Sequence, residues 1–160
     1  MSYWDFDEVR EVDFAGGSCL IVRREAIEEV GLLDEGYFMY TEEADWCYRL
    51  WQQDWKVYFY PGAQIIHLGG ESARRYGNNI LIRLYTSRNR FIRKHQGVAA
   101  ATVHRMIVGI GAVIRLFVFG AKKLLGKGEP DAIQFQAKLL RWTLLEPTDQ
   151  NTAVGQGRSA

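Results

Sequence analysis

A sharp change in charge along this chain of 160 residues limits what it can fold into. Residues 1–60 carry 14 Asp and Glu against 5 Lys and Arg, whereas residues 61–128 carry 1 acid against 12 bases. The net charge of +1 conceals this asymmetry. The pattern predicts one of two arrangements: the second part faces phosphate or anionic lipid, or the two parts are solvated faces of one fold.

The hydrophobic pattern changes at nearly the same place. Before about residue 76, short apolar runs alternate with Gly and Pro, which predicts short strands and helices. We expect a strand near residue 10, a Gly16-Gly17 break, a buried strand CLIV (19–22), a helix 24–31 closed by Gly31, a helix capped by Thr41, and strands KVYFY (56–60) and QIIH (64–67). From Asn79 the periodicity is helical, over 79–95, 98–126 and 131–145.

These elements predict an α/β fold with a mixed sheet over residues 1–78. A helical extension follows over 79–145, and the polar tail 146–160 is expected to be disordered. Cys19 and Cys47 lie in apolar runs and are predicted to be buried thiols of a reducing compartment. The first residues show no secretory signal, and the lack of 18 consecutive uncharged apolar residues argues against a spanning helix.

Three acids at the start of one predicted helix are the main functional candidates. Glu42 and Asp45 share a helical face, and Glu43 is offset by about 100°. Such acids usually complement the dipole of a solvated helix N-terminus. Here they follow an aromatic stretch of Tyr37, Phe38 and Tyr40, which is costly to expose without a purpose.

The order of motifs around these acids resembles a known family. Residues 12–72 are similar to the second half of inverting family-2 glycosyltransferases of the rhamnosyl and galactofuranosyl type. This segment reads VDFAGGSCLIVRREAIEEVGLLDEGYFMYTEEADWCYRLWQQDWKVYFYPGAQIIHLGGES. Residues 79–95 match more loosely, including the Ser-Arg-Asn of 87–89. The resemblance implies the acceptor-binding, C-terminal half of a GT-A fold. The half that holds the nucleotide sugar and an Asp-x-Asp metal motif is expected to be missing.

The resemblance also implies a chemistry for the acids. An inverting transfer needs a carboxylate that takes the proton of the acceptor hydroxyl as its oxygen attacks the anomeric carbon. Glu43 matches the family's catalytic acid, where aspartate is common. Glu42 or Asp45 would orient the acceptor or the base, and either one remains an alternative base.

Further site residues follow from the same resemblance. Acceptor contacts are implied for the loop acids Asp34 and Glu35, for Trp46, and for Gly17 and Ser18. Asp34 and Glu35 could equally be turn carboxylates, Trp46 a core residue, and the glycines a simple turn.

Anion and metal contacts are implied at and after the end of the last predicted strand, QIIH (64–67). Ser72, Arg74 and Arg75 lie on a loop that suits a diphosphate, because guanidinium groups match phosphate oxygens. A solvated basic loop is the alternative. His67 matches the family's metal-site histidine, against the alternative of a core or loop histidine. A divalent cation, Mg²⁺ or Mn²⁺, is expected only together with the missing half.

The implied partners are a nucleotide-diphosphate sugar and a saccharide or lipid-linked acceptor. Location in the cytoplasm, at the inner face of the plasma membrane, follows as an expectation for bacterial envelope polysaccharide biosynthesis. The basic helices suit peripheral membrane contact, packing on the catalytic part, or a second copy. Nucleic acid is not favoured, because no recognised fold or aromatic platform accompanies the basic run. The alternative function is a truncated, non-enzymatic domain that binds saccharide, membrane or a partner.

Overall fold

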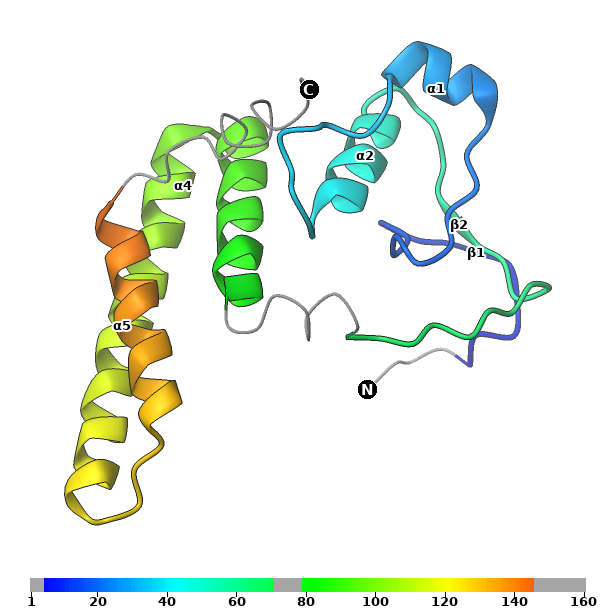
Figure 1. The fold of residues 1–160 in the computed structure, drawn as a ribbon. Helices are drawn as coiled ribbons and strands as arrows, with labels where there is room; N and C mark the ends of the chain where they lie inside the picture. The colour runs from blue at the N-terminus through cyan, green and yellow to red at the C-terminus, as the bar shows by residue number, and fades with distance from the viewer. Residues whose placement is uncertain (1–4, 71–78, 146–160) are drawn as a thin grey trace, which may run out of the picture. The chain divides into compact units, whose positions relative to one another are not determined.

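The computed structural model describes residues 5–70 and 79–145. The chain divides into two units, Met1–Gly77 and Asn78–Ala160 (Figure 1). Helices dominate the described residues, which contain one two-stranded sheet. The predictions for Ser72, Arg74, Arg75 and the tail 146–160 concern residues outside the described ranges.

A short antiparallel pair ties the beginning of the first unit to its later part. Strand β1 (Arg10–Glu11) pairs with β2 (Tyr58–Phe59), in the register Arg10 to Phe59 and Glu11 to Tyr58. The Val12 N–H continues the ladder to the Val57 carbonyl at 2.9 Å. The Lys56 ammonium also binds the Glu11 carboxylate at 2.9 Å.

Two helices supply most of the core of this unit. Helix α1 (Arg24–Val30) ends at Gly31, whose φ of 83° lies in the left-handed region that favours glycine. Helix α2 (Glu42–Trp51) buries Trp46, Cys47 and Leu50, which recur at helical spacing. Both helices match the predicted positions, because their periodicity and the glycine stop are local signals.

Two predicted strands are absent from the described residues. Residues 19–22 and 64–67 have no strand assignment, and the sheet is a two-stranded pair, not a mixed sheet. Ile21 is 93% exposed and Ile66 is 92% exposed. A strand exists only when a neighbouring strand satisfies its backbone groups, and the described residues place no such neighbour beside either segment.

The cysteine prediction is half correct. Cys47 is fully buried in α2, whereas Cys19 is exposed in the segment that did not form a strand. Burial raises the pKa of the Cys47 thiol, partly offset by a hydrogen bond from the Ala15 backbone. Cys47 is therefore a packing residue that carries little thiolate.

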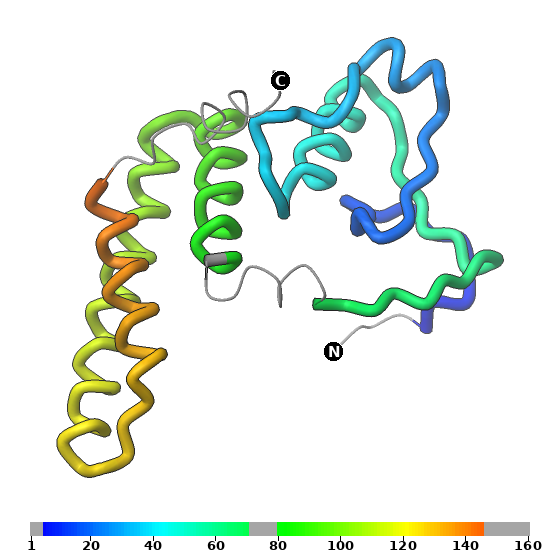
Figure 2. The backbone as a smooth tube through the Cα atoms, viewed as in Figure 1, coloured from blue at the N-terminus to red at the C-terminus, as the bar shows by residue number. Residues whose placement is uncertain are grey.

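The second unit is a set of helical segments. Helix α4 (Asn79–Leu124) is interrupted at Gly97, where φ of 89° and ψ of 174° are open only to glycine (Figure 2). Helix α5 (Pro130–Leu144) runs back along α4 and packs against it (Figure 1). The pattern from Asn79 onward therefore predicted helix correctly, and proline at the start of α5 fits its position.

The core of this unit lies between the segments on either side of the Gly97 break and α5. Ala112, Leu139 and Trp142 are its buried centre, with Ile82 and Tyr85 packed against them. The Trp142 indole N–H donates to the Thr86 hydroxyl at 3.0 Å. The Arg105 guanidinium donates to the carbonyls of Thr143 and Leu145, both at 2.8 Å, and so satisfies the end of α5.

Candidate functional site

The acidic cluster, formed by Glu42, Glu43 and Asp45, follows a strained turn. Tyr40 and Thr41 both have positive φ, 67° and 73°, which non-glycine residues rarely adopt. The predicted Thr41 cap is wrong, because its side chain makes no capping hydrogen bond in this left-handed conformation. Its carbonyl instead accepts the first helical bond from the Asp45 N–H at 2.9 Å. Strain of this kind persists only where the surrounding structure holds it.

Glu42 and Glu43 lie in the first turn of α2, and each has a carboxylate oxygen that accepts no hydrogen bond from the described residues. Each has one buried carboxylate oxygen, Oε2, with no hydrogen-bond partner among the described residues. Buried acceptors are nearly always satisfied in folded proteins, so an unsatisfied pair marks a place where a donor is expected to bind. Acceptor hydroxyls are donors of the required kind.

Gly17 brings the loop after β1 against Glu43. A Cβ atom built on Gly17 would lie 3.8 Å from both Cβ and Cδ of Glu43, in ordinary van der Waals contact. Gly17 and Ser18 are exposed, so the loop approaches Glu43 at the surface of the unit. Of the residues implied by the resemblance, Gly17 and Glu43 are therefore brought together.

The environment of Glu42 opposes its negative charge. Burial raises the pKa of Glu42 above that of an ordinary carboxyl group; its backbone N–H partly offsets this shift, and the charge of Glu43 adds to it. A carboxyl group with a raised pKa holds a proton more strongly, which suits a group that shares or accepts protons in a site.

Replacing Glu42 by glutamine should stabilise the protein at pH 7 and not under acid conditions. Because the folded-state pKa is raised, the cost of ionisation is absent below the unfolded carboxyl pKa of about 4.3, grows as pH rises from there to the folded pKa, and is constant above it. Urea unfolding of Glu42→Gln at several pH values measures this. Glu28→Gln, at an exposed position on α1, is the matched control. An equal effect of Glu42→Gln at every pH would contradict the assignment.

Asp45 has a different environment from its two neighbours. Its side chain is fully buried, and both oxygens are occupied: Oδ1 accepts from the Tyr37 hydroxyl at 3.1 Å and Oδ2 from Arg49 Nε at 2.9 Å. Arg49 also donates to the carbonyls of Val30 and Leu32, at 2.8 and 2.7 Å. Asp45 and Arg49 thus fasten α2 to the end of α1.

The sequence did not predict that Tyr37 and Arg49 both bind the carboxylate of Asp45. The signal for Arg49 was available, because an acid and a base four residues apart on a helix are expected to pair. No local sequence pattern predicts the hydrogen bond from Tyr37 to Asp45, because it joins a loop to a helix through tertiary folding.

The remaining acceptor candidates lie around the same loops. Asp34 Oδ1 accepts the Gly36 N–H at 2.8 Å, which closes the turn before the aromatic stretch, and Glu35 is exposed. Trp46 is only 8% exposed, and its indole N–H donates to the Gly31 carbonyl at 2.8 Å. The indole therefore packs the loop after α1 onto α2. The acceptor-binding roles of these residues stay predictions.

His67 lies in an exposed, extended segment, and its carbonyl accepts the Gly69 N–H at 2.9 Å. Within residues 5–70 and 79–145, no three His, Cys, Asp or Glu side chains are grouped to hold a metal ion. A divalent cation needs several oxygen or nitrogen ligands, so the described residues do not fit one by themselves. A metal role for His67 stays a prediction that requires further ligands.

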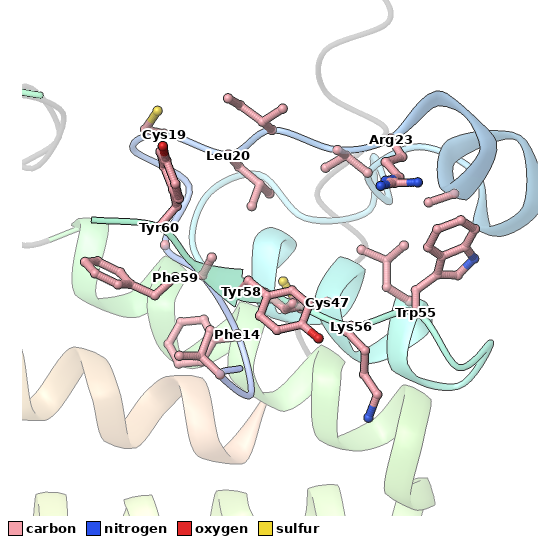
Figure 3. Close-up of a pocket in the computed structure, with 18 of the residues that line it drawn as sticks. Phe14, Cys19, Leu20, Arg23, Cys47, Trp55, Lys56, Tyr58, Phe59 and Tyr60 are labelled. Atoms are coloured by element: carbon pink, nitrogen blue, oxygen red, sulfur yellow. The ribbon is translucent and has the colours of Figure 1, made fainter. Parts of the chain in front are cut away.

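An apolar groove of about 930 Å³ lies beside the acidic cluster's helix. Figure 3 shows Cys19, Leu20 and Arg23 along one side and Trp55, Lys56 and Tyr58 along the other. Of the predicted site residues that the structure describes, Ser18 lines this groove, whereas the acids of α2 do not. Cys47 and Leu50 of α2 line it from the buried side of that helix.

Comparisons with known proteins identify relatives that share part of the chain. An N-acetylglucosaminyl-diphospho-decaprenol L-rhamnosyltransferase of Mycobacterium tuberculosis is 42% identical over 66 residues, which are 41% of this chain and 22% of that protein. The low-salt glycan biosynthesis hexosyltransferase Agl10 of Haloferax volcanii is 31% identical over 84 residues, 52% of this chain and 27% of that protein. The rhamnosyltransferase WbbL of Escherichia coli is 34% identical over 65 residues, 41% of this chain and 25% of that protein.

The chain thus spans about a quarter of the length of the curated relatives it matches. No family model matches the chain, and no solved structure matches it significantly. The relatives relate part of this chain to glycosyltransferases that transfer rhamnose or another hexose.

Proposed function

We propose that the first unit is the acceptor-side part of an inverting glycosyltransferase of family 2 with a GT-A fold. The observation that carries the proposal is the Glu42–Glu43 pair, with two buried carboxylate oxygens that lack partners among the described residues, and with Gly17 so placed that a Cβ atom there would contact Glu43. The relatives that transfer rhamnose or another hexose support the same class of reaction.

Glu43 is the proposed catalytic base. Its carboxylate would accept the proton of the acceptor hydroxyl while that oxygen attacks the anomeric carbon of a nucleotide-diphosphate sugar and the nucleotide diphosphate leaves. Glu42, one residue earlier, would hold the acceptor through a second hydroxyl. Asp45 already accepts two hydrogen bonds, so it supports the turn and does not compete for the proton.

The proposed acceptor is a saccharide or a lipid-linked saccharide. The M. tuberculosis relative has a diphospho-decaprenol substrate in its name, which supports a lipid-linked acceptor for this chain as well. The proposed path of the acceptor to the carboxylates runs over Gly17 and Ser18. A side chain at position 17 would contact Glu43, so the glycine leaves room there for the acceptor.

Catalysis by this unit would need more polypeptide than the described residues contain. Ile21 and Ile66 are almost fully exposed, and Leu20 lines the apolar groove between two extended segments. Apolar surface of this kind is usually covered in a working domain. The proposed cover is the nucleotide-binding part of the same enzyme, which would also bring the donor sugar to Glu43.

The isolated chain should transfer no sugar, because it would lack the donor site. The pure protein is incubated with a panel of nucleotide-diphosphate sugars and Mn²⁺, and nucleotide-diphosphate release is measured. The matched positive arm replaces the homologous 66-residue segment of the M. tuberculosis relative with the segment of this chain. Rhamnosyl transfer should survive in that chimera and disappear when it also carries Glu43→Gln. Steady turnover by the isolated chain, or a folded chimera indifferent to Glu43→Gln, would overturn the proposal.

A further inference from the structure

The outer face of α4 after the Gly97 break is a continuous apolar stripe. Exposed apolar side chains recur there every three or four residues: Val103 (48% exposed), Met106 (55%), Ile107 (63%), Ile110 (62%), Ile114 (58%) and Phe117 (77%). At about 100° per residue these positions share one side of the helix. Ala101 and Ala112 are buried on the opposite side, where the core with Leu139 and Trp142 lies. The stripe is therefore not covered by α5.

The outer face of α5 has the opposite character. Asp131, Gln134, Lys138 and Arg141 are exposed at the spacing of one helical face. The packed pair α4 and α5 thus presents an apolar surface on one side and a water-compatible surface on the other. A single polar–apolar boundary, such as the surface of a bilayer, matches both sides at once.

Charge favours an anionic boundary over a second copy of the chain. From Asn79 to Gly128 the sequence has ten Lys and Arg and no Asp or Glu. Arg115 and Lys122 are exposed on one flank of the stripe, about 100° to 120° around the helix from Val103. Lys123 and Lys127 are exposed past its C-terminal end, and the Arg115 guanidinium lies against Gly111 on the same flank. Two copies joined through the stripe would bring like charges together, whereas acidic lipid headgroups would neutralise them.

The same helix is long and apolar enough by composition to cross a membrane, since Ile80–Leu124 contains a window of mean hydropathy 1.7. The expectation drawn from uncharged runs alone was therefore too strict. A crossing would place the polar face of α5 and the Arg105 and Arg115 side chains in hydrocarbon, which costs several kcal/mol per charge. A position in the interfacial plane avoids that cost.

We propose that the stripe from Val103 to Phe117 lies on an anionic lipid bilayer, with α5 facing water and the neighbouring Lys and Arg side chains reaching the headgroups. The proposal rests on α4 and α5 and is independent of the transfer reaction proposed for the first unit. Long basic side chains suit this position, because their stems pack on apolar surface while the charge stays in the headgroup layer.

Flotation with vesicles tests the proposal. The full chain should float with vesicles of phosphatidylcholine and phosphatidylglycerol and should stay in solution with phosphatidylcholine alone. Ile110→Gln with Ile114→Gln should weaken vesicle binding by at least about tenfold, because two apolar side chains leave the interface. Lys122→Gln with Lys123→Gln should weaken it by about tenfold to thirtyfold and reduce its sensitivity to salt.

The matched control is Ile21→Gln with Ile66→Gln, which changes two isoleucines of the first unit that are even more exposed than Ile110 and Ile114 and should leave vesicle binding unchanged. Circular dichroism confirms that each variant keeps its helices. Three outcomes would overturn the proposal. The first is a wild-type chain that does not float with anionic vesicles. The second is a stripe variant that dissociates a dimer without affecting lipid binding. The third is vesicle-bound chain that resists carbonate extraction, which would indicate a spanning helix.

Discussion

Replacing Glu43 by glutamine in the complete enzyme is expected to reduce turnover by about 10²–10⁴-fold while leaving donor affinity nearly unchanged. Glutamine keeps the shape of the side chain and its place beside Gly17 but cannot accept a proton from the acceptor hydroxyl. The measurement is the steady-state rate of transfer, with donor binding determined separately by calorimetry.

Glu42→Gln and Asp45→Asn are the comparison variants for this experiment. Glu42→Gln should raise the KM for the acceptor more than it lowers kcat, because its proposed role is to hold a second hydroxyl. If Glu43→Gln retains wild-type turnover while Glu42→Gln or Asp45→Asn abolishes it in a folded enzyme, then the base is not Glu43.

Replacing Asp45 by alanine is expected to destabilise the first unit by about 3 kcal/mol. The change removes the partner of Arg49 Nε and of the Tyr37 hydroxyl, and it leaves a guanidinium charge beside a buried cavity. Arg49 keeps its bonds to the carbonyls of Val30 and Leu32, so the cost should fall at the lower end for a broken buried pair. Urea unfolding followed by tryptophan fluorescence measures the loss.

Glu28→Ala, at an exposed position on α1, is the control for removing one carboxylate from the unit and should change the free energy of unfolding by less than about 0.5 kcal/mol. The double variant Asp45→Ala with Arg49→Ala should lose less than the two single variants together, because the pair is coupled. Additive losses would show that Asp45 stabilises the protein without Arg49.

The helices were predictable because their signals are local. Apolar spacing located α1, α2, α4 and α5, and Gly31 and Pro130 mark helix boundaries that the sequence displays. The sequence predicted strands at CLIV and QIIH that the described residues do not form, because a strand depends on a neighbour that can lie anywhere in the sequence. Local apolar character alone suggested burial for Ile21 and Ile66, which the described structure leaves exposed.

The candidate site shows the same division. The spacing of Glu42, Glu43 and Asp45 placed three carboxylates within two turns of one helix, as the structure shows. It could not show that Asp45 is buried against Tyr37 while the other two keep unsatisfied oxygens, because that difference arises from the loop that packs over α2. The approach of the Gly17 backbone to Glu43 likewise brings together segments that are distant in sequence.

The one-residue break at Gly97 has a consequence for how the second unit forms. It joins two helical segments through a single non-helical residue, and a short connection joins the second segment to α5. Closing such short loops costs little entropy. The core nevertheless includes a contact of much longer range, because Trp142 at the end of α5 donates to Thr86 near the start of α4. The β1–β2 pair of the first unit likewise brings Arg10 to Phe59 across two intervening helices. Each unit is therefore completed by a contact that closes a long stretch of its own chain.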